Sequence, residues 1–275
     1  MRRSPAELES ALDAVPSLVA RDRPIALFLD YDGTLTEIVS RPEDAVLSGE
    51  MRAAVRDAAA AFDLVAVVSG RDRHGVEELV ALPELAYVGS HGFDIAGPVG
   101  SGLSHEVGLA HRPALDAAEA ALRTRLAAIA NAEVERKRFS IAVHLRRVAP
   151  EASAEVERVF DEVARTSSTL RRARGKAVLE LQPDVAWDKG RAVQWLLEER
   201  RLTDSLAIHL GDDWTDESVF AALADRGIGI LVGDRGDSTA ATLRLRDPGE
   251  VLTFLRRLVA SAPHRRRSQQ QQQQQ

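Results

Sequence analysis

Two aspartates near the start of the chain, Asp30 and Asp32, have the spacing that phosphoryl transfer needs. They follow the apolar run 25–29, which predicts a buried strand. Side chains two residues apart on an extended chain share a face, so both carboxylates can reach one reacting centre. One of them can attack phosphorus while the other moves a proton. The alternative is a strand that ends in a polar turn, because Asp-Gly pairs such as Asp32-Gly33 are common in turns.

Two further segments offer groups that bind phosphate. Ser69, which follows the apolar run 64–68, supplies a hydroxyl and, together with Gly70, backbone N–H groups for a phosphate oxygen. Lys189 opens a segment with an apolar stripe that predicts a helix, and its ammonium can neutralise the phosphate and the nucleophile. The alternatives are an ordinary strand-to-helix turn at Ser69 and a solvated surface lysine at Lys189.

The segment 211–217 concentrates carboxylates, with Asp212, Asp213 and Asp216 and without a lysine or arginine. Such a cluster is costly unless a hard cation binds it. Oxygen ligands beside a phosphate substrate favour Mg²⁺. Alternatively, the acids serve the start of a helix, with Thr215 as the N-cap and Asp216 in the first turn.

The composition excludes several classes of protein. The 275 residues suffice for one large domain or two modest ones, and the net charge of −6 does not favour nucleic-acid binding. The absence of cysteine excludes disulfides and thiolate metal sites. The N-terminus lacks the apolar core of a secretory signal, and no apolar stretch reaches about 18 residues. We therefore expect a cytoplasmic protein without a membrane span.

Strands and helices alternate along most of the chain. Each predicted strand is a short apolar run that ends in a cluster of Gly, Ser or Asp; the runs are 25–29, 64–68, 86–88, 206–210 and 228–232. Alternation of this kind predicts an α/β fold, with a parallel sheet and helices on both of its faces. The ligand is then expected at the carboxyl ends of the strands.

The middle of the chain, residues 108–186, has a different pattern, because paired strands alternate there with helices. Strand-like segments are expected over 133–147, and a second strand pair is expected over 169–182 with its turn at residues 174–176. We interpret it as an inserted α+β module with an antiparallel sheet, since the strand-then-acid pattern resumes after it. The predicted division is a helical lead-in over 1–23, a core domain over 24–107 and 187–262, the insertion over 108–186, and a disordered basic and glutamine-rich tail over 263–275.

The order of the motifs Asp-x-Asp-Gly-Thr, Ser-Gly-Arg, Lys and Gly-Asp-Asp-x-Thr-Asp-Glu resembles the haloacid dehalogenase superfamily. The residues around these motifs resemble those of the trehalose-6-phosphate phosphatases, over about residues 24 to 258. The matching segments are 28–35, 68–71, 89–92, 187–190 and 211–217. The resemblance implies a Rossmann-like core with an inserted α/β cap domain. It also implies that Asp30 is the nucleophile that forms an aspartyl-phosphate, and that Asp32 is the general acid and base.

The same resemblance implies the ligands of the metal and of the phosphate. Mg²⁺ would be held by the Asp30 carboxylate, the Asp32 main-chain carbonyl and Asp212, with Asp216 in or near the shell; whether Asp213 is a ligand stays open. The phosphate contacts would be Ser69, Gly70, Arg71 and Lys189.

The cap is expected to recognise the sugar. Leu145 replaces a tyrosine of the family, and Gln182 stands where arginine is common, so the identity of the sugar stays open. The candidate substrate-binding residues are His91, Lys137, His144, Arg146 and Glu180. The alternatives are a solvated sheet face for the cap residues and a hydrogen bond within the glycine-rich loop for His91.

The resemblance implies a phosphoric monoester hydrolase that converts trehalose 6-phosphate to trehalose and phosphate, acting as a monomer on a small sugar phosphate, with a functional link to a synthase of that substrate. One alternative is a phosphatase of sucrose 6-phosphate, glucosylglycerol phosphate or mannosylglycerate phosphate. A second alternative is a non-catalytic regulatory module. Loss of Asp30 or Lys189 would mark such a module, and both are present.

Overall fold

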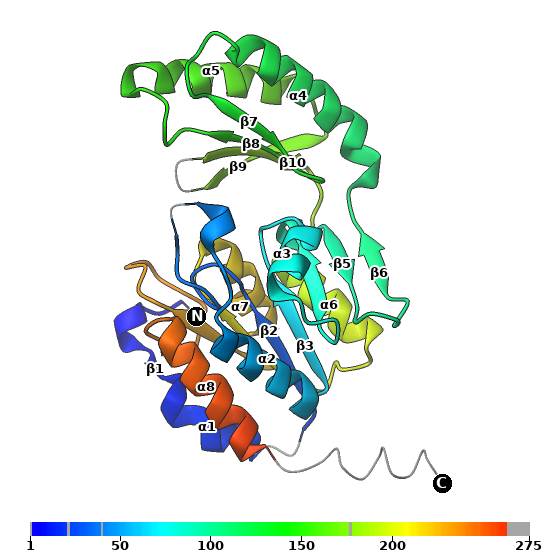
Figure 1. The fold of residues 1–275 in the computed structure, drawn as a ribbon, viewed down its shortest axis with the longest axis vertical. Helices are drawn as coiled ribbons and strands as arrows, with labels where there is room; N and C mark the ends of the chain where they lie inside the picture. The colour runs from blue at the N-terminus through cyan, green and yellow to red at the C-terminus, as the bar shows by residue number, and fades with distance from the viewer. Residues whose placement is uncertain (1, 21–22, 40, 176–177, 263–275) are drawn as a thin grey trace. The chain divides into compact units, whose positions relative to one another are not determined.

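The structure, a computed structural model, describes residues 2–20, 23–39, 41–175 and 178–262. It divides into two compact units, one of Met1–His105 with Trp187–Gln275 and one of Glu106–Ala186 (Figure 1). The chain leaves the first unit once and returns once, so the second unit is an insertion. The expected disordered tail lies outside the described residues. In the described ranges, no helix is long and apolar enough to cross a membrane.

Within the described residues of the first unit, nine strands form one sheet in the order β1-β13-β12-β11-β2-β3-β4-β5-β6. Neighbouring strands from β1 to β4 in this order pair in parallel, whereas β5 is antiparallel to β4. The strands are β1 (Glu9–Ser10), β2 (Ile25–Leu29), β3 (Leu64–Val68), β4 (Ala86–Gly89), β5 (Asp94–Ala96), β6 (Ser104–Glu106), β11 (Leu206–Gly211), β12 (Gly227–Val232) and β13 (Leu243–Leu245).

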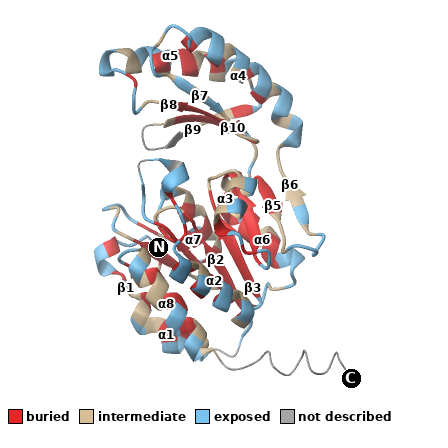
Figure 2. Cartoon of the chain, viewed as in Figure 1, coloured by how far each residue is buried: buried red, intermediate tan, exposed pale blue. Residues whose placement is uncertain are grey.

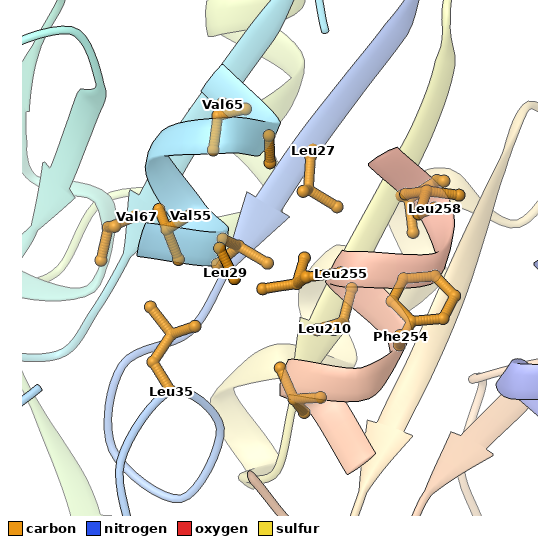
Figure 3. Close-up of a cluster of buried hydrophobic side chains, with 14 of the residues drawn as sticks. Leu27, Leu29, Leu35, Val55, Val65, Val67, Leu210, Phe254, Leu255 and Leu258 are labelled. Atoms are coloured by element: carbon orange, nitrogen blue, oxygen red, sulfur yellow. The ribbon is translucent and has the colours of Figure 1, made fainter. Parts of the chain in front are cut away.

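Helices cover both faces of this sheet, which explains why its central strands are apolar throughout. Leu27 and Leu29 of β2 point to one face, while Ala26 and Phe28 belong to the apolar cluster on the other. The first face is covered by α1 (Ala11–Val19), α2 (Gly49–Ala61), α3 (Arg73–Val80) and α8 (Pro248–Ser261). The second is covered by α6 (Lys189–Glu199) and α7 (Glu217–Leu223). Figure 3 shows the first cluster between the strands, α2 and α8.

The N-terminal segment is part of the first unit, which differs from the expected surface lead-in over 1–23. Helix α1 begins after Ser10, whose hydroxyl accepts from the backbone N–H of Leu12. Its residues Ala11 and Val15 are buried in the core, and β1 adds an edge strand to the sheet by pairing with β13. The apolar stripe therefore anchors the segment to α8.

The second unit contains a four-stranded antiparallel sheet in the order β7-β8-β10-β9. Its strands are β7 (Glu133–Arg136), β8 (Ile141–His144), β9 (Leu170–Gly175) and β10 (Val178–Pro183). Its helices α4 (Arg112–Leu126) and α5 (Pro150–Arg165) share an apolar cluster with Ile141, Val143, Leu179 and Leu181. Alternation along the strands places Ser140, Glu180 and Gln182 on the opposite, polar face. In Figure 2 the strands β8 and β10 of this core are largely red, whereas α4 and α5, which pack against them, are partly exposed.

One sequence-based expectation for this unit needs correction, and a second falls partly outside the described residues. Strand β8 ends at His144, so Arg146 lies in a turn and not on the strand that was expected to continue to residue 147. The backbone N–H of Val148 closes that turn on the carbonyl of Leu145, at 3.1 Å. The second expectation was a turn at 174–176, of which Lys176 lies outside the described residues.

Candidate active site

Asp30 and Asp212 follow the carboxyl ends of two neighbouring parallel strands. Leu29 of β2 lies opposite Leu210 of β11, and the backbone N–H of Asp30 donates to the carbonyl of Leu210 at 2.9 Å. Because parallel strands end at the same edge of a sheet, this register brings two carboxylates from distant parts of the sequence together.

Asp30, Asp212 and Asp216 form one acidic cluster. Each offers a carboxylate oxygen, and these oxygens all lie within 4.8 Å of one another. Burial has the largest influence on the pKa of Asp30 and raises it. The ammonium of Lys189 lowers this pKa, whereas the neighbouring carboxylates Asp216 and Asp212 raise it, and the net result lies well above the ordinary value. Burial, followed by the charges of Asp216 and Asp213, raises the pKa of Asp212 to about 7. Full ionisation of the three carboxylates is therefore unfavourable at this buried site unless a cation binds there.

Lys189 supplies the cation beside the nucleophile. It is only 2% exposed, and its Nζ lies 2.9 Å from Oδ1 of Asp30 and 2.9 Å from Oδ1 of Asp216. Burial alone would lower the pKa of Lys189, but the two carboxylates outweigh it and raise the pKa above the ordinary value. The side chain of Asp188 caps α6 by accepting from the backbone N–H of Arg191, which fixes the helix start that carries Lys189. Lys189 is therefore not a solvated surface lysine.

Both oxygens of Asp216 accept hydrogen bonds. Oδ1 contacts Lys189 and also Nε2 of His209, at 3.1 Å, while Oδ2 accepts from the backbone N–H of Asp213 at 3.0 Å. Burial would raise the pKa of Asp216, but Lys189 and His209 outweigh it and lower the pKa below the ordinary value. The N-cap of the short helix at Trp214–Asp216 is Asp213 and not Thr215, because the Asp213 carboxylate accepts from the N–H of Trp214 at 2.7 Å.

The acidic cluster fits a hard divalent cation. Oδ1 of Asp212 is buried and has no hydrogen-bond partner within the described part of the chain. Gly33, at a φ of 77°, packs directly against this carboxylate, and a Cβ at that position would overlap it. Asp30 and Asp212 carry carboxyl groups with raised pKa values, and Oδ1 of Asp212 is an acceptor that no described residue fills. Such a group of oxygens suits Mg²⁺, which prefers oxygen ligands.

Arg71 binds Asp32 with both ends of its guanidinium group. Nε donates to Oδ2 at 2.7 Å and Nη2 donates to Oδ1 at 2.6 Å. The guanidinium carbon also lies 5.3 Å from the centre of the Tyr31 ring. Burial would lower the pKa of Arg71, but Asp32 raises it. The sequence predicted a phosphate contact for Arg71 and did not reveal this bidentate pair with Asp32.

The loop that follows β3 is built by backbone hydrogen bonds. The N–H of Ser69 donates to the carbonyl of Val88 at 2.8 Å, and the Ser69 hydroxyl accepts from the N–H of Arg71 at 3.1 Å. The first bond leaves the Ser69 hydroxyl, and not its N–H, for a phosphate. Gly70 lies against the ring of His91, and a Cβ there would overlap the imidazole. His91 has a φ of 57°, a strained value that the surrounding loop must hold in place.

The candidate sugar-binding residues Lys137, His144, Arg146 and Glu180 all lie in the second unit. Glu180 accepts from the Ser140 hydroxyl at 2.5 Å and lies 3.6 Å from Nζ of Lys137. His144 forms a separate pair, with its Nε2 at 2.8 Å from Glu135, and this contact lowers the pKa of Glu135. The structure therefore brings Lys137 and Glu180 together, and it adds Ser140 to their group.

Sequence reasoning missed His209 and Tyr31. His209 is fully buried in β11, and the available signal was a single polar residue inside the apolar run 206–210. Tyr31 lies between the two motif aspartates but belongs to the apolar cluster under α2, and its hydroxyl donates to the carbonyl of Ala45 at 2.6 Å. The alternation that puts Asp30 and Asp32 on one face puts Tyr31 on the other.

The fold and the site together define the structural class of the protein. The structure is similar to a haloacid dehalogenase-like hydrolase from Bacteroides thetaiotaomicron, with a TM-score of 0.60 and 16% identity over 86% of this chain and 100% of that chain. A likeness at this identity shows the fold alone, and it confirms the predicted class: a Rossmann-like α/β core with an inserted cap.

The sequence model of the trehalose-phosphatase family matches residues 28–248. The chain is 40% identical to a probable trehalose-phosphate phosphatase 2 of Oryza sativa subsp. japonica, over 91% of this chain and 72% of that protein. It is 39% identical to a trehalose-phosphate phosphatase of Mycobacterium marinum, over 94% and 67%. A crystal structure of a trehalose-6-phosphate phosphatase related protein has a TM-score of 0.72 and 25% identity, over 86% and 97%. The chain belongs to the trehalose-phosphatase family.

Proposed function

We propose that this protein is a Mg²⁺-dependent phosphatase that hydrolyses trehalose 6-phosphate to trehalose and phosphate. The observation that carries the chemistry is the buried contact of 2.9 Å between Lys189 Nζ and Asp30, inside a cluster of three carboxylates. The substrate is supported by the family and by the names of relatives about 40% identical over nine-tenths of the chain.

In the first step, an oxygen of Asp30 forms a bond to phosphorus while the bond from phosphorus to the sugar oxygen breaks. Asp32 gives its proton to the leaving sugar oxygen. In the second step, Asp32 takes a proton from water, the water oxygen bonds to phosphorus, and the bond to Asp30 breaks. Lys189 offsets the negative charge where the phosphate approaches a buried carboxylate.

The metal would be held by the carboxylates of Asp30 and Asp212 and by the main-chain carbonyl of Asp32. When bound, Mg²⁺ supplies positive charge that stabilises the ionised carboxylates and the transferring phosphoryl group. Asp216 has both oxygens engaged by hydrogen bonds, so we assign it to the anchoring of Lys189, close to the metal shell.

Arg71 has to leave Asp32 before Asp32 can reach the leaving oxygen of the substrate, because the guanidinium engages both carboxylate oxygens. We propose that the substrate phosphate provides the alternative partner, with Ser69, Gly70 and Lys189 as the other phosphate contacts. In the cap, Lys137, His144, Arg146 and Glu180 would recognise sugar hydroxyls, and His91 would act from the core. We further propose that the protein is a cytoplasmic monomer and that a synthase supplies its substrate.

The fold alone does not distinguish an enzyme from a regulatory protein. The C-terminal domain of a Candida albicans trehalose synthase regulatory protein has the same fold, with a TM-score of 0.69 and 13% identity. The residues decide for an enzyme here, because the nucleophile and the ammonium are both present and in contact. A different sugar phosphate is the second candidate substrate, and it is favoured only by Leu145 and Gln182.

The test is Mg²⁺-dependent phosphate release from a panel of trehalose 6-phosphate, sucrose 6-phosphate, glucosylglycerol phosphate and mannosylglycerate phosphate. We expect the highest kcat/KM with trehalose 6-phosphate and no turnover with EDTA. A higher kcat/KM with another sugar would overturn the assigned substrate. No release from any phosphate ester would overturn the enzyme assignment itself.

A further inference from the structure

We infer that His209 is a positioning residue that holds Asp216, and through it Lys189, in place beside the nucleophile. The inference rests on the function proposed above and extends it to a residue outside the four motifs. His209 lies in β11 directly opposite Phe28 of β2, and Phe28 precedes the nucleophile Asp30 by two residues. It is fully buried.

The imidazole of His209 joins two acceptors. Its Nδ1 lies 3.2 Å from the carbonyl oxygen of Phe28, and its Nε2 lies 3.1 Å from Oδ1 of Asp216. The carbonyl oxygen of Phe28 and the carboxylate oxygen of Asp216 are both hydrogen-bond acceptors, and the two ring nitrogens are the polar atoms of His209 that meet them. Phe220 packs against the ring at 5.4 Å between centroids and limits its rotation. The ring therefore ties the strand of the nucleophile to the carboxylate that holds Lys189.

Asp216 needs this support because it is the second anchor of the Lys189 ammonium. Its Oδ1 contacts both Lys189 and His209, and its Oδ2 accepts from Asp213. On another side it packs against Gly211, where a Cβ would overlap the carboxylate. Without the His209 donor, Oδ1 loses one of its two partners, and the carboxylate gains freedom to rotate about its side-chain bonds. Lys189 would then follow Asp216 away from Asp30.

The expected effect is larger on the chemical step than on substrate binding, because the other proposed phosphate contacts stay in place. Lys189 faces the charge that develops on the transferring phosphoryl group, whereas the proposed sugar contacts of the cap lie in the other unit. A displacement of the ammonium by about 1 Å is enough for a loss of about 100-fold in rate. The loss should therefore appear in kcat, with KM for trehalose 6-phosphate nearly unchanged.

Two substitutions separate the two hydrogen bonds of the ring. The amide of His209→Gln reaches the position of Nε2 and keeps a donor for Asp216, while that of His209→Asn reaches only the position of Nδ1 and keeps a donor for Phe28. We expect His209→Asn to lose roughly 10- to 100-fold in kcat and His209→Gln to recover most of that loss. Thermal unfolding of both variants is the matched control, since each removes one buried hydrogen bond.

Equal kcat values for the two variants, or losses that only follow their unfolding temperatures, would overturn the inference. Crystal structures of the variants give a readout that does not depend on turnover. We expect the distance between Lys189 Nζ and Asp30 to stay near 2.9 Å in His209→Gln and to lengthen in His209→Asn. An unchanged distance in His209→Asn would refute the positioning role even if the protein acted on a different substrate, or on none.

Discussion

The two units of the chain hold their polar residues in different ways. In the first unit, Asp30, Asp216 and Lys189 are buried, and each is fixed by partners from several elements. In the second unit, polar side chains form local pairs on one sheet, such as His144 with Glu135, both about half exposed. A buried charge costs several kcal/mol unless it is paired, so the first arrangement tolerates little change, while exposed pairs contribute about 0–1 kcal/mol. On the function proposed above, the first unit therefore holds the chemistry, and changes in the second unit should affect recognition of the sugar.

The nucleophile should give the largest effect. We expect Asp30→Asn to lower kcat by at least about 10⁴-fold, as removal of a covalent nucleophile does. The fold should persist, because the raised pKa of Asp30 means that the folded state already disfavours its ionised form. Phosphate release and thermal unfolding measure the two effects, with the exposed Asp57→Asn as the control. Substantial turnover in Asp30→Asn would remove Asp30 as the nucleophile.

Two lysines give the most direct contrast between the units. Lys189→Met should lower kcat by about 10²- to 10³-fold, with trehalose 6-phosphate and with p-nitrophenyl phosphate alike, because the phosphoryl charge loses its cation. Lys137→Met should raise KM for trehalose 6-phosphate by about tenfold, which is the loss of about 1.4 kcal/mol of binding, and should leave the small ester unaffected. A kcat effect of Lys137→Met on the small ester would contradict the division of roles.

Asp212 should make the effect of Mg²⁺ on stability depend on pH. Its pKa is raised from 3.8 to about 7, so the stability it contributes to the metal-free protein is complete below about pH 4 and is lost as the pH rises through 7. Mg²⁺ binds the ionised form, and its stabilisation, about 2.7 kcal/mol at 100 times Kd, should therefore grow between pH 5 and pH 8. Thermal unfolding with and without Mg²⁺ measures this growth. Asp212→Asn should abolish it, and an undiminished Mg²⁺ effect in that variant would exclude Asp212 as a ligand.

The smallest effect is expected for the exposed pair of the second unit. His144→Ala should change the free energy of unfolding by less than about 0.5 kcal/mol, because an exposed ion pair contributes little. If His144 contacts the sugar, KM for trehalose 6-phosphate rises a few-fold while kcat stays constant. A loss of kcat in this variant would place chemistry in the second unit and break the comparison.

The parallel sheet and the convergence of Asp30, Asp212 and Lys189 follow from local patterns in the sequence. An apolar run that ends in an acid specifies both a strand and the edge at which its carboxylate emerges. The partners of Arg71 and of His209 could not be predicted, because the apolar pattern places strands and helices but does not determine the side-chain conformations that pair Arg71 with Asp32 and His209 with Asp216. The end of β8 at His144 was missed for a similar reason, since Leu145 continues an apolar pattern but serves a turn.

The return of the chain from the second unit has a consequence for engineering. Trp187 is the first residue back in the first unit, and its indole N–H donates to the carbonyl of Gly92 at 2.8 Å, only two residues before Lys189. A graft that exchanged the insertion for one with another sugar preference would have to join the chain upstream of this indole. A junction one residue later would remove the tryptophan, and with it the hydrogen bond to Gly92 that lies next to the start of the helix that carries the ammonium.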